Sequence, residues 1–206
     1  MNETTGFGRH PSDELQKLFK VRPFQIQEPE KAKIIFLGRD ANWDRDIDQN
    51  ECFFNEVKKY LRNGVKYWTE KYIHSPMLIP CYKGEGKRYH TQFCKLEFTY
   101  KNAEDICFLE LLNYCTCGTS SKNNKLFMEK VDAKENKEYR DRIIDLSKKK
   151  DIKICIPDGL KSIIDELGLF PTNGKNIITH KHFSDAISDE DLGELNKELH
   201  KFLKSK

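Results

Sequence analysis

Four short apolar runs are spaced along the chain, at residues 33–38, 105–112, 151–156 and 176–179. Their side chains follow one another with few polar interruptions, which is typical of strands that are covered on both faces. Each run ends close to a glycine, proline, asparagine or threonine, where a strand can give way to a turn. The runs therefore predict four buried strands.

Segments with helical signals separate these runs. Residues 51–62 have apolar side chains at helical spacing, residues 122–149 are rich in charge, and residues 158–167 precede a glycine; a last helix begins at Asp189 or Asp191. Strands that alternate with helices usually form a parallel sheet covered on both faces. The sequence predicts an α/β fold: a three-layer α/β/α sandwich with a central, mainly parallel four-stranded sheet.

One domain accounts for the whole chain. We expect residues 1–206 to form a single unit in which residues 1–30 make an N-terminal arm and a short helix that begins after Ser12, a residue that caps helices well. Residues 65–103 show no clear periodicity and are expected to cover one end of the sheet. Ligands of such sheets bind beyond the carboxyl ends of the strands, so the residues that follow each strand are the candidate site.

The composition of the chain gives information about its binding partners and its cellular location, but not about the reaction. The formal net charge is only +3, from 36 basic and 33 acidic residues, so charge alone does not predict nucleic-acid binding. The seven cysteines are an odd number without paired spacing, which favours a reducing compartment. Residues 1–14 lack the apolar core that is typical of a signal peptide, and no apolar run approaches the roughly 20 residues of a membrane helix. We expect no membrane association, and a cytoplasmic location, or a nuclear one in a cell with a nucleus.

The first predicted strand runs into Gly38, Arg39, Asp40, Ala41 and Asn42. Glycine permits close approach of a ligand to the backbone. A carboxylate at this edge of the sheet can orient or deprotonate a water molecule, which makes Asp40 a candidate catalytic residue. The alternative is an ordinary turn, in which aspartate and asparagine are common.

Polar residues also follow the second and fourth strands. Asn113 has an amide that offers a donor and an acceptor together, which suits the edge of a base, or it caps a turn. His180, His182 and Ser184 follow the last strand, and they could bind metal, act as acid, donate to an anion or simply be solvated.

The order of these three sites resembles the uracil-DNA glycosylase superfamily. Its members have a Gly-x-Asp-Pro-type loop, then a Leu-Asn pair, then a His-x-Ser loop; the corresponding segments here are Gly38–Asp40, Leu112–Asn113 and His182–Ser184. The resemblance covers roughly residues 30–204. Two positions depart from it, since Ala41 and Phe183 stand where the family usually has proline.

The resemblance implies hydrolysis of an N-glycosidic bond to an extruded base in DNA, in which Asp40 holds the water and His182, or His180, donates to the leaving base. Asn113 would read the base edge and Ser184 would grip a phosphate. Further substrate-binding residues would be Gly38, Arg39, Asn42 and a stacking ring, Phe53 or Phe54. No cofactor is implied, because no four-cysteine cluster motif is present.

Three readings stay open from the sequence. The chain is a glycosylase acting on DNA, a silent member of the same fold that binds nucleic acid, a nucleotide or a protein, or an unrelated α/β hydrolase of a small polar ligand. The basic loop at residues 83–90 either tracks a DNA backbone or is a solvated loop. His90 and Cys94 lack the paired spacing of a structural zinc site, so we expect no metal. The oligomeric state is open.

Overall fold

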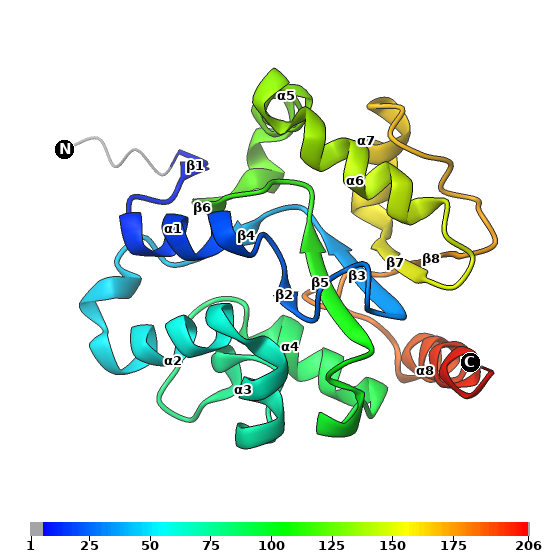
Figure 1. The fold of residues 1–206 in the computed structure, drawn as a ribbon, viewed down its shortest axis with the longest axis horizontal. Helices are drawn as coiled ribbons and strands as arrows, with labels where there is room; N and C mark the ends of the chain where they lie inside the picture. The colour runs from blue at the N-terminus through cyan, green and yellow to red at the C-terminus, as the bar shows by residue number, and fades with distance from the viewer. Residues whose placement is uncertain (1–5, 206) are drawn as a thin grey trace.

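The computed structural model describes residues 6–205 and shows a mixed α/β fold (Figure 1). Its larger sheet has five strands in the order β2–β5–β3–β7–β8. The bounds are Gln25–Ile26 for β2, Ile34–Gly38 for β3, Ile106–Glu110 for β5, Lys153–Pro157 for β7 and Ile177–His180 for β8. Strands β5, β3, β7 and β8 are parallel to one another, and they are the four that the apolar runs predict.

The prediction of a four-stranded sheet was wrong by one edge strand. β2 pairs antiparallel with β5, so the sheet has five strands and is mixed. β2 consists of only Gln25 and Ile26, which is too short to show the period of a strand in the sequence. Residues 6–30, expected as an arm with a helix, therefore include a strand of the central sheet; the expectation for residues 1–5 lies outside the described residues.

A second, three-stranded sheet lies beyond the ends of β3 and β5. Its order is β1–β6–β4, with bounds Gly8–Arg9, Cys115–Cys117 and Ala41–Asn42. β4 follows β3 after two residues, and β6 follows β5 after four. Because β4 and β6 pair in parallel, the loops after two neighbouring strands of the large sheet are held together. Asp40 lies in one of these loops, between the two sheets.

Helices cover both faces of the larger sheet (Figure 1). Side chains alternate along β3, so Ile34 and Phe36 pack into one hydrophobic cluster while Ile35 and Leu37 pack into the other. On the Phe36 side lie α1 (Asp13–Val21), α2 (Glu51–Arg62), α3 (Gly64–Lys71), α4 (Lys87–Phe93) and α8 (Asp189–Lys204); on the Leu37 side lie α5 (Asn124–Asp132), α6 (Lys137–Ser147) and α7 (Asp158–Glu166).

No helix among residues 6–205 is long and apolar enough to cross a bilayer.

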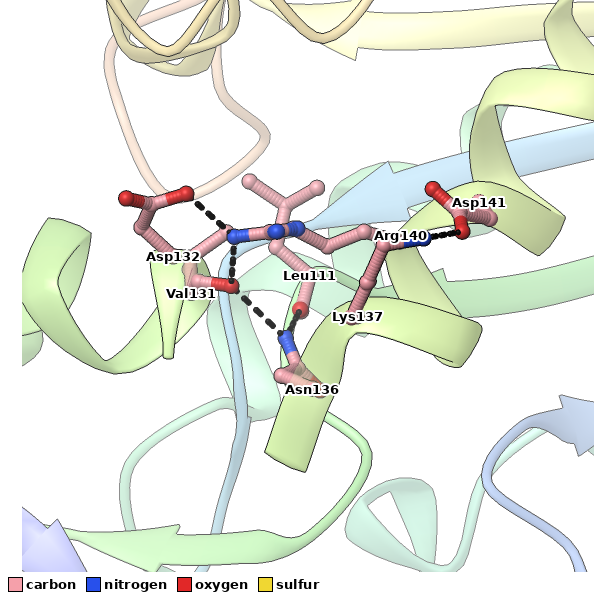
Figure 2. Close-up of polar contacts among 7 residues, drawn as sticks. All are labelled: Leu111, Val131, Asp132, Asn136, Lys137, Arg140 and Asp141. Carbon is pink, nitrogen blue, oxygen red and sulfur yellow. Dashed lines mark hydrogen bonds and ion pairs between the residues drawn. The ribbon is translucent and has the colours of Figure 1, made fainter. Parts of the chain in front are cut away.

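The end of β5 is held by the connection between α5 and α6. Figure 2 shows the buried Asn136, whose Nδ2 donates to the carbonyl oxygens of Leu111 and Val131, both at 3.2 Å. Arg140 donates to the same Val131 carbonyl and to Asp132. Buried carbonyls need such partners. The chain after β5 is therefore tied to a segment that lies well beyond it in the sequence.

Candidate functional site

A cleft of about 660 Å³ opens at the carboxyl ends of the parallel strands. Gly38 comes from the end of β3, Glu110 from the end of β5 and Pro157 from the end of β7. This is the edge where ligands of parallel sheets bind. Six of the residues predicted from the sequence line the cleft: Gly38, Arg39, Asp40, Asn42, His182 and Ser184.

Asp40 is a fixed carboxylate in this cleft. One oxygen accepts a hydrogen bond from the hydroxyl of Thr116 in β6, and the other accepts one from Ser120 Oγ at 2.5 Å. Burial raises the pKa of Asp40, while the two hydroxyls and the neighbouring Arg39 guanidinium oppose that rise. Asp40 is therefore positioned by its loop and by the small second sheet.

Glu110 is the second carboxyl group of the site, and its position depends on two neighbours. A β-carbon on Gly38 would stand 2.0 Å from Glu110 Oε2, so the missing side chain makes room for this carboxyl group. Glu110 Oε1 accepts a bond from Gln25 Nε2 at 3.4 Å, and the hydroxyl of Tyr60 donates to Gln25 Oε1 at 3.1 Å. The strand β2 that the sequence did not predict thus supplies a partner of Glu110.

The two acids have different protonation tendencies. Burial raises the pKa of Glu110 well above its usual range, and the nearby Asp40 charge raises it further. Asp40 has hydroxyl donors and a guanidinium to stabilise its charge. Glu110 is consequently the member of the pair that keeps a proton, and Asp40 is the member that ionises first.

His182 is a neutral donor in the same cleft. The backbone N–H of Ser184 donates to His182 Nδ1 at 3.2 Å, so the proton of the neutral ring is on Nε2. Burial lowers the pKa of His182, with a further lowering from Arg39 and an opposing effect from Asp185. The ring lies beside Tyr89, with centroids 5.3 Å apart.

Aromatic and apolar side chains form much of the remaining wall. Phe36, Phe108, Tyr89, Trp43 and Met77 all line the cleft. An apolar wall with a few convergent polar groups is the usual composition of a small-molecule site. Flat aromatic faces suit a flat ring in particular.

Four residues predicted to belong to the site lie elsewhere. Asn113 is half-buried beyond the end of β5 and does not line the cleft, because the strand stops at Glu110 and the two leucines after it turn into the core. Phe53 and Phe54 are buried on α2, where Phe53 stacks on Tyr82 with centroids 4.1 Å apart. His180 bonds the carbonyl of Lys181 at 2.7 Å and stacks on Phe183, so of these two histidines His182 is the one that reaches the cleft.

Arg39 and Asn42 line the cleft but are occupied by structural contacts. Arg39 donates to Ser120 Oγ at 3.2 Å, to the Ser120 carbonyl at 3.1 Å and to Asn124 Oδ1 at 2.8 Å, and it lies over the Phe127 ring. The side chain of Asn42 donates to the Gly118 carbonyl. Both residues hold the rim together rather than offering free donors.

Sequence reasoning missed Glu110, Gln25 and Tyr89. The sequence did contain a signal for Glu110, because an acidic residue inside the apolar run 105–112 is unusual unless it has a partner or a functional role. Gln25 and Tyr89 gave no such signal. The basic loop at residues 83–90 is a wall of the cleft, to which Glu85, Gly86, Tyr89 and His90 contribute.

Among the described residues, the cysteines and the possible metal ligands form neither a disulfide nor a metal site. All seven cysteines are free thiols, with Cys52, Cys81 and Cys94 exposed. Within residues 6–205, no three histidine, cysteine, aspartate or glutamate side chains are grouped so that they could hold a metal ion. No protein-family model, curated protein or solved structure matches this chain.

Proposed function

We propose that this protein hydrolyses an N-glycosidic bond between a sugar and a heteroaromatic base, with a base in DNA as its substrate. The observation that carries the proposal is that the acid pair Asp40 and Glu110 and the ring of His182 line one cleft with aromatic walls. Enzymes that cleave bonds at an anomeric carbon usually use two carboxyl groups whose environments give them different pKa values.

The residues would divide the chemistry as follows. The bond from sugar C1′ to the base nitrogen breaks, and its electron pair leaves with the base. The ionised Asp40 stabilises the positive charge on the sugar and takes a proton from the water whose oxygen bonds to C1′. His182 Nε2–H donates to the base as negative charge develops there, and the protonated Glu110 is the group that supplies the proton to the leaving base.

The surface around the cleft supports a substrate that carries phosphates. Lys83 is two residues from Glu85, and Lys122 and Lys125 directly follow Ser121 and Asn124, all of which line the cleft. The three lysines are exposed, and none of them makes an ion pair within the described residues. Free lysines of this kind bind a nucleic-acid backbone without reading its sequence. Ser184 lines the cleft and is the hydroxyl proposed to contact a phosphate.

One observation favours a silent binder instead. Both oxygens of Asp40 already accept hydroxyl hydrogen bonds, which occupy lone pairs that would otherwise accept a proton from water. In that case the cleft would bind the base, a nucleotide or another ligand without cleaving it.

The proposal includes the fold and the compartment. We infer that the two helical faces and the mixed sheet make a three-layer α/β/α sandwich of the uracil-DNA glycosylase-like kind. The cytoplasm, or the nucleus of a cell that has one, is the proposed location, because seven free thiols suit a reducing compartment.

The test is a cleavage assay on labelled oligonucleotides. Single- and double-stranded DNA, each with one uracil or one other damaged base, is incubated with the purified protein, and abasic sites are revealed by alkaline strand scission. We expect scission at one or more of the modified positions. Nucleosides and nucleotides are assayed in parallel by release of the free base.

Matched variants separate this site from contaminating activity. Asp40→Asn and Glu110→Gln should lose cleavage, whereas Asp141→Asn should keep it, since Asp141 is an exposed carboxylate on α6 that pairs with Lys137. Binding without cleavage of any substrate would favour the silent binder. Cleavage that survives in the Asp40→Asn and Glu110→Gln variants would refute the proposed roles.

A further inference from the structure

Behind one wall of the cleft lies a pair of histidines that the proposed reaction does not use. His90, on α4, lines the cleft, and His74 is buried behind it with 3% of its surface exposed. Nε2 of His74 and Nδ1 of His90 are 2.9 Å apart, which is a hydrogen-bond distance. The other nitrogen of His74, Nδ1, is 4.0 Å from Cys94 Sγ.

Both rings are neutral in this position. Burial lowers the pKa of His90 to about 3, and burial together with His90 lowers the pKa of His74 well below its usual range. Phe93 and Phe108 pack against the rings and provide no counter-charge. When two neutral imidazoles form a hydrogen bond, only one of the two facing nitrogens carries a proton. The tautomer of one ring therefore sets the tautomer of the other.

We use the thiol of Cys94 to assign which group donates in each hydrogen bond of the series Cys94, His74 and His90. Although Cys94 as a residue is exposed, desolvation of its thiol beside His74 raises the pKa of Cys94, so the sulfur keeps its proton and can act as a weak donor to His74 Nδ1. His74 then carries its own proton on Nε2 and donates to His90 Nδ1. The proton of His90 is left on Nε2, an atom that has no hydrogen-bond partner among residues 6–205.

We propose that His90 is a ligand-binding residue of the cleft, which donates its Nε2–H to an acceptor atom on the edge of a bound heteroaromatic ring. His74 is the positioning residue that holds His90 in this tautomer and orientation. The inference rests on the base-binding part of the proposed function and not on bond cleavage. It gives the cleft a second neutral donor, on a different element from His182, and favours rings that carry carbonyl-type acceptors.

The first measurement needs no ligand. Long-range proton–nitrogen NMR spectra of protein labelled with ¹⁵N-histidine distinguish the two neutral tautomers of each ring, and the His90→Phe variant assigns the His90 signals. We expect His90 as the Nε2–H tautomer in the wild type and a mixture of tautomers in His74→Phe. His74→Gln, whose amide can still donate to His90 Nδ1, should restore the wild-type signal. A wild-type His90 protonated on Nδ1 would overturn the proposal.

The second measurement tests the ligand contact with two probes, uracil and pyrimidine, which is a ring without carbonyl acceptors. Loss of one neutral hydrogen bond should weaken uracil binding about 3- to 10-fold in His90→Phe, with pyrimidine binding unchanged. His200→Gln is the control, because His200 bonds the Leu96 carbonyl and does not line the cleft. Equal uracil affinities in wild type and His90→Phe would refute the contact.

The two proposals fail in different ways. If uracil binds through His90 but no oligonucleotide or nucleoside is cleaved, the proposed reaction is wrong and this inference stands. If cleavage occurs with equal efficiency in His90→Phe, the reaction stands and this inference is wrong. If the wild type binds no uracil, the contact with His90 is refuted together with base binding.

Discussion

Glu110 occupies the space that a side chain on Gly38 would need, because its Oε2 lies 2.0 Å from the position of a β-carbon there. The glycine at the end of one strand thus allows a carboxyl group from the next strand to face the cleft. The backbone of Gly38 has no positive φ, so alanine can adopt its conformation. The requirement for glycine here is one of space alone.

Gly38→Ala should therefore fold and lose function by moving Glu110. We expect activity close to that of Glu110→Ala, and no further loss when the two changes are combined, because both remove the same group from the cleft. A double-mutant cycle on cleavage or uracil binding measures this. Gly193→Ala is the control, since nothing lies within 4 Å of a β-carbon at Gly193. Additive losses would show that Gly38 acts independently of Glu110.

Asp40→Asn should lower turnover far more than it weakens binding. The carboxylate acts on a water molecule and on positive charge that is fully developed only in the transition state. We expect kcat to fall by about 10²–10⁴-fold, with a similar Kd for an uncleaved DNA analogue. A variant as active as the wild type would assign the role to another acid, with Asp44 or Asp46 in the same loop the next to replace.

The buried histidine pair should make the protein acid-labile. The folded-state pKa values of His74 and His90 are lowered, so the stability that their neutral forms contribute is present above the unfolded-state pKa of about 6.5 and is lost as pH falls below it. Urea unfolding between pH 7 and pH 4.5 should show a smaller loss of unfolding free energy in the His74→Phe/His90→Phe double variant than in the wild type. Equal losses would mean that the pair does not titrate in this range.

Asn136→Ala should destabilise the protein by about 1–3 kcal/mol, because the buried Leu111 carbonyl would lose its donor and the Val131 carbonyl would keep only the one from Arg140. Urea unfolding measures the change, and Asn173→Ala, at an exposed position, is the control. We also expect weaker function at temperatures where the variant is still folded, because Leu111 is the residue next to Glu110. A change below about 0.5 kcal/mol would show that water replaces the amide.

The elements of this fold follow from local properties of the sequence. Continuous apolar runs predict β3, β5, β7 and β8, because a strand covered on both faces needs apolar side chains on both. Helical spacing and the Asn50 cap give α2 the bounds that the sequence predicts. The position of Asp40 and His182 at the carboxyl edge follows as well, because parallel strands end on one side of a sheet.

Only the tertiary structure decides which of the neighbouring polar residues enter the cleft. Glu110 faces it and Asn113 does not, because β5 ends where Asn136, distant in sequence, holds the Leu111 carbonyl. Gln25 reaches Glu110 through a two-residue edge strand, and His74 meets His90 across a loop. Contacts of this kind join residues far apart in the chain, so no local period or spacing encodes them; they exist only once the elements have packed.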